Sequence, residues 1–212
     1  MSATVSKDLF VLAADLELKN ALDGLLSRAT DLGVRDVSYD IERHPNRDSG
    51  CRRDAVEYLR PYLRGYRHAL VVFDHYGCGS TDLRKEIQLH VEAQLSRNGW
   101  GDRAKVIVIE PELEVWVWDG SPATCRVLGW DRSYAALRRW LGRRRLWEAG
   151  EPKPSDPKKA MREAMQHGRV QRSARRFSEL ARAIDSSRCE DPAFNELRGA
   201  LQEWFPRTVP IQ

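Results

Sequence analysis

The chain has 212 residues, of which 42% are hydrophobic and 31% are charged, and its formal net charge is +4. This composition suits one globular domain, or one domain with a substantial appendage, and it excludes a disordered protein. No stretch approaches the roughly 18 consecutive apolar residues of a membrane span, and the opening residues MSATVSKDLF lack the pattern of a signal peptide. We therefore expect a cytoplasmic protein with no membrane partner.

The first part of the chain alternates apolar runs with helical patterns. Apolar runs at residues 9–14, 68–73 and 104–109 predict buried strands, and helical spacing predicts helices over residues 16–33 and 81–98. The strands are almost continuously hydrophobic, which is typical of a sheet covered on both faces. The pattern therefore predicts an α/β fold with a largely parallel sheet flanked by helices.

Charge divides the chain into two regions. Residues 1–120 hold 16 Lys and Arg against 20 Asp and Glu, whereas residues 121–212 hold 19 against 11. We expect an α/β domain over the first region and a basic helical extension, packed on it, over the second. Such asymmetry is one signature of nucleic-acid contact, although a solvated basic face would explain it as well.

Acidic residues follow each of the three predicted strands. They are Asp15 and Glu17 after the first strand, Asp74 after the second, and Glu110, Glu112 and Glu114 after the third. If the strands are neighbours, these side chains converge beyond the carboxyl ends of the sheet, where ligands of open α/β sheets bind. Clustered carboxylates repel one another unless a cation neutralises them, and hard oxygen ligands suit Mg²⁺ or Mn²⁺. The simpler alternative for Asp15 is a helix cap.

The segment IEPELEVWVW, residues 109–118, has two interpretations. As a helix, it places Glu112 near the N-terminus behind Pro111; as a strand, it alternates apolar and acidic or aromatic side chains. We favour the helix. Trp116 and Trp118 are expected to pack between the two regions rather than to stack on bases, because large aromatic side chains dominate core burial.

These motifs resemble those of Toprim-like proteins. An acid follows the first strand, VVFDHYGCG follows a later one, and EPELEVWVW follows the next. The resemblance covers roughly residues 8–120 and is to an uncharacterised bacterial branch related to the nuclease part of OLD-family proteins. It implies a divalent metal held for phosphodiester cleavage, with Asp15 or Glu17 as the first acid, Asp74 as the second, and Glu112 or Glu114 as the third.

The resemblance implies a nuclease of antiviral defence, with Asp74, His75 and Glu112 as catalytic residues. His75 would protonate the leaving oxygen or contact the phosphate. Toprim domains usually carry Glu at the first acidic position and Asp-x-Asp at the second, whereas this chain has Asp15 and the sequence Asp74, His75, Tyr76. The alternative is therefore a non-catalytic Toprim-like subunit that binds protein partners in a multi-gene defence complex.

The second region combines helix starts with basic side chains. Ser121-Pro122, Asp156-Pro157 and Asp191-Pro192 each pair a capping side chain with proline, which predicts three helix starts. Residues 138–176 hold 13 Lys and Arg against 4 Asp and Glu. This segment predicts contact with the phosphates of DNA or RNA, or else pairing with the acidic first region. The candidate nucleic-acid contacts are Arg143, Arg144, Arg145, Lys153, Lys158 and Lys159.

Cysteine and histidine offer a weaker hypothesis. Two His and two Cys could make a tetrahedral zinc site, although their spacing is unlike a zinc knuckle. These residues are His44, Cys51, His75 and Cys78. With Cys125 and Cys189, the chain has four cysteines and no CxxC pair, so we expect reduced thiols rather than disulfides.

Overall fold

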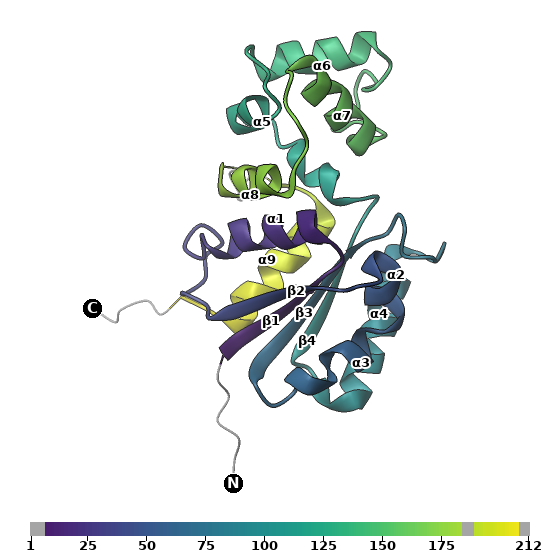
Figure 1. Cartoon of the computed structure of the whole chain (residues 1–212), viewed down its shortest axis with the longest axis vertical. Helices are drawn as coiled ribbons and strands as arrows, with labels where there is room; N and C mark the ends of the chain where they lie inside the picture. The colour runs from purple at the N-terminus through teal and green to yellow at the C-terminus, as the bar shows by residue number, and fades with distance from the viewer. Residues whose placement is uncertain (1–6, 184–188, 208–212) are drawn as a thin grey trace, which may run out of the picture.

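The computed structural model describes residues 7–183 and 189–207 (Figure 1). Within them, four strands form one all-parallel sheet in the order β2-β1-β3-β4. The strands are β1 (Lys7–Ala13), β2 (Tyr39–Arg43), β3 (Tyr66–Asp74) and β4 (Ala104–Ile109). The three strands predicted from apolar runs are thus present and adjacent, and the expected α/β class is confirmed.

Helices cover both faces of the sheet, which is why its central strands are apolar on both sides. Figure 1 shows α1 (Leu16–Leu26) and α9 (Pro192–Trp204) on one face, and α2 (Arg47–Arg53), α3 (Ala55–Leu59) and α4 (Arg84–Leu95) on the other. The short 3₁₀ helix η1 (Arg60–Tyr62) and the turn η2 (Ser96–Trp100) lead into β3 and β4, respectively. The interior residues of β1, β3 and β4 are fully buried between these layers.

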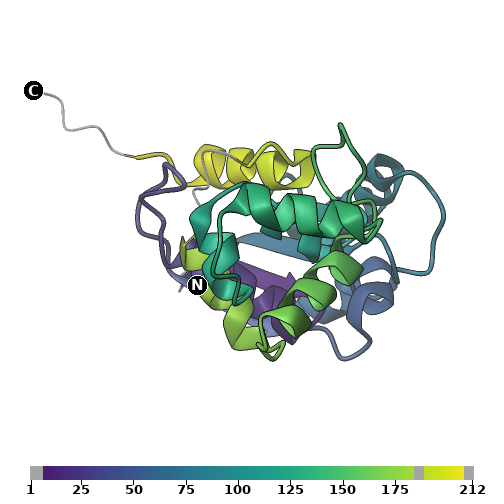
Figure 2. The same ribbon diagram turned by 90° about the horizontal axis from the view of Figure 1, so that it is seen from above.

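The remaining helices extend the molecule beyond the carboxyl ends of the strands (Figures 1 and 2). They are η3 (Leu113–Val117), α5 (Pro122–Val127), α6 (Tyr134–Arg143), α7 (Pro157–His167) and α8 (Ala174–Ala183). Helix α8 packs on α1, and α9 packs beside β4. The end of the expected extension is therefore built into the layers around the sheet.

All three helix starts predicted from capping residue and proline are confirmed. The side chain of Ser121 accepts from the Thr124 N–H of α5, and Asp156 accepts from the Lys159 N–H of α7. Asp191 accepts from two backbone N–H groups at the start of α9. The helix preferred for the run at residues 109–118 is present as the 3₁₀ helix η3.

The two tryptophans of the η3 segment are buried, as expected for packing between the regions. Trp116 Nε1 donates to Asp191 Oδ1 at 2.9 Å, and Trp118 Nε1 donates to the Pro157 carbonyl at 3.4 Å. The start of α7 and the start of α9 are therefore held against η3. The four cysteines are buried and unpaired, as predicted.

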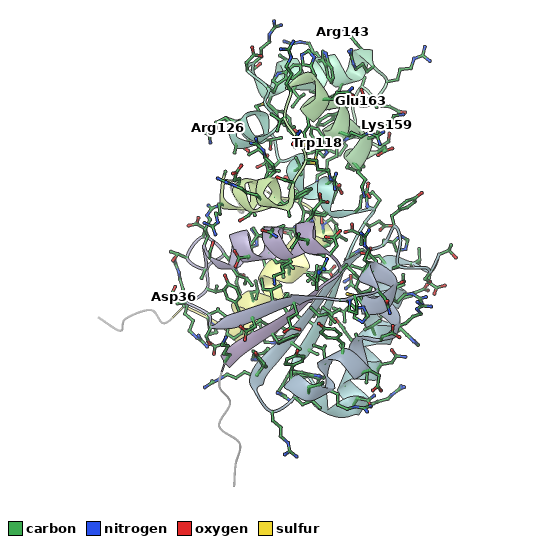
Figure 3. The ribbon with its side chains drawn as sticks, in the orientation of Figure 1. Asp36, Trp118, Arg126, Arg143, Lys159 and Glu163 are labelled. Atoms are coloured by element: carbon green, nitrogen blue, oxygen red, sulfur yellow. The ribbon has the colours of Figure 1, made fainter. Side chains whose placement is uncertain are left out.

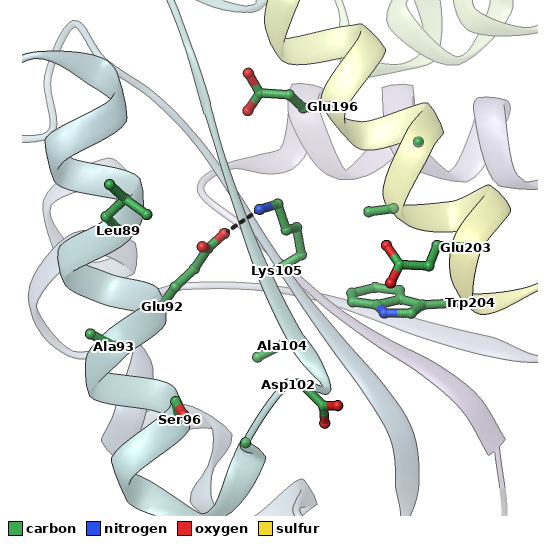
Figure 4. Close-up of a pocket in the computed structure, with 13 residues that line it drawn as sticks. Leu89, Glu92, Ala93, Ser96, Asp102, Ala104, Lys105, Glu196, Glu203 and Trp204 are labelled. Carbon is green, nitrogen blue, oxygen red and sulfur yellow. Dashed lines mark ion pairs between the residues drawn. The ribbon is translucent and has the colours of Figure 1, made fainter.

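Strand β4 is an edge of the sheet within the described residues. Two of its backbone N–H groups are satisfied by side chains of α4: Val106 N donates to Glu92 Oε1 at 3.0 Å, and Val108 N donates to Gln88 Oε1 at 3.4 Å. A groove of about 630 Å³ runs along this edge between α4 and α9, and Figure 4 shows Glu92 paired with Lys105 inside it. No helix in the described ranges is long and apolar enough to cross a membrane.

Candidate metal centre

The order of the strands determines where polar side chains gather. The chain passes from β1 to β2 on one side and then returns to β3 on the other side of β1. Ligands of open parallel sheets bind at such a switch point, beyond the carboxyl ends of the strands. Asp15 follows β1 and Asp74 ends β3, so both lie at the switch point.

The described residues include one group of His, Cys, Asp and Glu side chains arranged so that it could hold a metal ion. Asp74, Glu112 and Glu114 each offer one carboxylate oxygen, and these oxygens lie within 4.8 Å of one another. Glu112 and Glu114 are buried, and Asp74 is half-buried. The loop after β4 and the start of η3 bring the two glutamates to the end of β3.

Backbone groups hold Asp74 in place. Its Oδ1 accepts from the Leu113 N–H at 2.9 Å, which joins the end of β3 to η3. Its own N–H donates to Asp48 Oδ1 at 2.8 Å. Asp48, in the first turn of α2, was not predicted as a site residue from the sequence. Its position after β2 was the one available signal, because β2 ends at the same edge of the sheet. We call the acids at this edge the rim: Asp15, Asp48, Asp74, Glu112 and Glu114.

Burial and like charge perturb the acids of this group. Burial raises the pKa of Asp74 well above its ordinary value, and repulsion from Asp48, Glu114, Asp15 and Glu112 raises it further. The pKa of Asp48 is also raised, first by burial. The rim therefore carries more carboxylates than it can comfortably ionise without a cation.

Asp15 caps α1, since its Oδ1 accepts from the Leu18 N–H at 2.9 Å. This observation supports the simpler interpretation of Asp15. Its charge nevertheless reaches the rim, because it contributes to the raised pKa values of Asp48 and Asp74. Asp15 is thus a capping residue that also belongs to the acidic surroundings of Asp74.

Two cations from the helical region neutralise the glutamates. Lys158 Nζ, at the start of α7, donates to Glu112 Oε2 at 2.7 Å and lies 4.0 Å from Glu114 Oε1. Arg172, just before α8, pairs with both Glu17 and Glu114. Burial raises the pKa of Glu114, and the two cations oppose that shift. Sequence reasoning missed Arg172, which carried no signal beyond belonging to a basic segment.

The other predicted acids and His75 lie outside the group of three. Glu110 is exposed at the end of β4, and Glu17 is engaged by Arg172. His75 Nε2 lies 2.9 Å from the Asp82 carbonyl, so its described contact is within its own loop. The catalytic role of His75 stays a prediction.

The His and Cys residues of the zinc hypothesis do not form a metal-binding group among the described residues. His44 Nδ1 accepts from the Asn46 N–H at 3.0 Å. Cys78 Sγ lies 3.9 Å from the Ser80 carbonyl. Each side chain is therefore accommodated locally, at a turn or within the core.

The six basic residues predicted to contact nucleic acid fall into different environments. Lys158 pairs with the rim, and Lys153 lies 3.7 Å from Asp191. The remaining four are exposed: Arg143, Arg144, Arg145 and Lys159. Pairing with acids and contact with phosphates therefore both stay open for the basic segment, because some of its cations pair within the fold and others face solvent.

A cavity of about 370 Å³ opens beside the rim. Its lining includes Glu112, Lys158 and Tyr76, and the Tyr76 side chain lies in the loop after β3 with 77% of the residue exposed. The cavity therefore gives a solvent route to Glu112.

Comparison with protein-family models, with curated proteins and with solved structures gives no match for this chain. The fold and the rim alone define its class, an α/β protein whose switch point carries an acidic group.

Proposed function

We propose that the protein binds Mg²⁺ or Mn²⁺ at Asp74, Glu112 and Glu114 and acts on phosphodiester bonds of nucleic acid. The observation that carries the proposal is the convergence of three carboxylate oxygens within 4.8 Å. Oxygens bound to one Mg²⁺ at about 2.1 Å lie at most about 4.2 Å apart, so small side-chain rotations bring the three to one ion. The raised pKa of Asp74 supports the proposal, because a cation would relieve the repulsion around it.

The surrounding residues suit this role. A bound ion would polarise a phosphate and lower the pKa of an attacking water. The Leu113 N–H and Asp48 hold Asp74 in a fixed orientation, and Lys158 and Arg172 supply donors of the kind that bind phosphate oxygens. Exposed Tyr76 offers a ring beside the cavity on which a base would stack.

The Toprim-like resemblance of residues 8–120 supports the same chemistry and motivates the proposed setting in bacterial defence. DNA or RNA is the proposed substrate, because the helical region carries exposed arginines, among them Arg143, Arg144 and Arg145. The choice between DNA and RNA is left to the substrates used in the test below.

A second candidate function is a non-catalytic subunit that binds protein partners of a defence complex. The observation that favours it is the pairing of Lys158 with Glu112 and of Arg172 with Glu114. Cations supplied by the chain already balance two of the three carboxylates. In this alternative, the rim is a structural ion-pair network that joins α7 and the start of α8 to the sheet.

Calorimetric titration with Mn²⁺ tests the metal site. The wild-type protein is expected to bind with micromolar to millimolar affinity, and Asp74→Ala and Glu112→Gln are each expected to weaken binding about tenfold or more. Glu110→Gln is the matched control, because Glu110 is exposed and lies outside the group. Equal affinity for Mn²⁺ in the wild-type and Asp74→Ala proteins would contradict the proposed metal site.

Cleavage assays separate the two candidate functions. Supercoiled plasmid, single-stranded DNA and RNA are incubated with Mn²⁺ or Mg²⁺, and we expect activity with Mn²⁺ first, because it tolerates imperfect geometry better. Activity should disappear in folded Asp74→Ala and Glu112→Ala proteins and persist in Glu110→Gln. If Mn²⁺ binds but no substrate is cut with either metal, the partner-binding subunit becomes the preferred function.

A further inference from the structure

A second polar cavity lies between α6 and α7, separate from the rim. It has a volume of about 330 Å³, and we call it the α6–α7 pocket. Its lining combines aromatic and cationic side chains with one acid: Trp130, Trp140, His167, Arg132, Arg139, Arg143 and Asp131, with Ala136. Three arginines against one aspartate favour an anion as its ligand.

Two of the arginines carry unbalanced charge. Arg139 and Arg143 are exposed, and neither has a hydrogen bond or ion pair with any other described residue. They stand one helical turn apart on α6, where two like charges are neighbours and destabilise each other. Within the part of the chain that the structure describes, the Arg132 side chain has one ion contact, 3.9 Å from Asp131. A bound anion would satisfy all three guanidinium groups.

Aromatic and imidazole side chains form one wall of the pocket. Trp130 and Trp140 are buried, with 7% and 9% of each residue exposed. The exposed imidazole of His167 packs against Trp130 and Trp140, with ring centroids 5.0 and 4.8 Å away. In this ring wall, the exposed ring of His167 offers a stacking surface next to the arginines.

We propose that the α6–α7 pocket binds the phosphate of a nucleotide, with its base against the ring wall. Arginine matches phosphate because its planar guanidinium donates two parallel hydrogen bonds to phosphate oxygens. Aromatic and imidazole faces stack on nucleobases without regard to sequence. The ligand is a free nucleotide or a nucleotide unit of a nucleic-acid strand, and both share this chemistry.

The position of the pocket relates it to the rim. Lys158 of the rim is near the start of α7, and His167 ends the same helix. A helical rise of about 1.5 Å per residue separates the two by roughly 14 Å. Figure 3 shows Arg143 at the far end of the helical region, away from the sheet. A nucleic-acid strand held in the pocket would therefore run along α7 toward the acids of the rim. The choice of nucleic acid as ligand rests on the proposed function, whereas phosphate binding in the pocket does not require the metal.

The test measures binding without metal. A fluorescein-labelled single-stranded DNA decamer is titrated with protein in EDTA, and fluorescence anisotropy is followed at several salt concentrations. Arg139→Gln and Arg143→Gln are each expected to weaken binding about five- to tenfold, as for loss of a charged hydrogen bond. Each should also lower the slope of log affinity against log salt by about 0.7.

Arg145→Gln is the matched control. Arg145 belongs to the same run of arginines and is exposed, but it does not line the pocket. We expect less than about a twofold change in affinity for this variant. An equal loss of affinity in Arg145→Gln and Arg143→Gln would overturn the proposed pocket, because the decamer would then bind to the basic surface as a whole. A wild-type protein that binds neither the decamer nor AMP would also overturn it.

Competition distinguishes the two sources of the phosphate. Displacement of the decamer by AMP, and not by the same concentration of inorganic phosphate, supports a site for a free nucleotide. Binding of the decamer without displacement by AMP supports a site for a strand. Because the titration contains EDTA, it measures binding in the pocket without a metal ion at the acidic group. If the protein cleaves no substrate but binds the decamer in EDTA as expected, the proposed function is contradicted and the proposal of a nucleotide-binding pocket stands.

Discussion

The acidic rim and the α6–α7 pocket use the basic residues of one segment in opposite ways. At the rim, Lys158 and Arg172 lie against Glu112 and Glu114, which are buried. In the pocket, exposed Arg139 and Arg143 have no acidic partner among the residues the structure describes. Both sets of cations come from a segment that looks uniformly basic in sequence. The comparison teaches that the burial of the opposing acids decides which cations stabilise the fold and which remain available to a ligand.

The largest expected effect is on the rim. Arg172→Met leaves Glu114 buried without its main cation, and removal of one partner from a buried pair typically costs about 3–5 kcal/mol. We expect about 3 kcal/mol of lost unfolding free energy, measured by urea denaturation, because Lys158 still lies 4.0 Å from Glu114. Arg175→Met is the control, since its pair with Glu179 is exposed and should contribute less than about 1 kcal/mol. Equal losses in the two variants would contradict the contrast between rim and pocket.

A smaller effect, of opposite sign, is expected at Asp74. Because its pKa is raised in the folded state, the unfolded chain loses this proton first, and stability falls as pH rises above the ordinary value near 3.8. Asp74→Asn removes that repulsion and keeps an oxygen for the Leu113 N–H. We expect it to be more stable than the wild type by about 1 kcal/mol near pH 8, with a smaller difference near pH 5.

Urea denaturation of both proteins at the two pH values measures this difference. A gain that is equal at both pH values would mean that charge repulsion is not its cause. Excess Mn²⁺ should reverse the order near pH 8, because only the wild type retains the full set of carboxylates for the ion.

The smallest expected effect is in the pocket. Arg139→Gln and Arg143→Gln should each change the unfolding free energy by less than about 0.5 kcal/mol, because these side chains are exposed and unpaired among the described residues. Thermal and urea denaturation measure the change. A loss above about 1 kcal/mol in either variant would show that its charge stabilises the fold, and would place it with the cations of the rim.

The rim could be predicted from sequence because it depends on local patterns and one topological rule. Continuous apolar runs located β1, β3 and β4, and the acids directly after them fall at one edge once the strands are parallel neighbours. Asp48 was not predicted as a member of the rim because it lies in a helix after β2, and the strand pattern of β2 is weak. Its contact with the Asp74 N–H depends on how α2 packs beside β3.

The partners of the rim and the composition of the pocket could not be predicted. Lys158 lies 46 residues from Glu112, and Arg172 lies 155 residues from Glu17. Periodicity identifies the helices that carry these residues but does not give the angle at which the helices cross. The basic segment 138–176 likewise predicted contact with phosphates or pairing with the acidic first region, whereas the pocket arises because His167 of α7 reaches Trp130 and Trp140.

The outer edge of β4 has a consequence for how the chain behaves before it is fully folded. Unpaired edge strands are templates for pairing with other molecules, and native proteins protect them. Here, Gln88 and Glu92 of α4 occupy the N–H groups of Val108 and Val106. Until α4 docks, the run AKVIVI is an exposed β-forming segment whose main deterrent to aggregation is the charge of Lys105. The docking of α4 therefore sets the period during which newly made chains can aggregate through this edge.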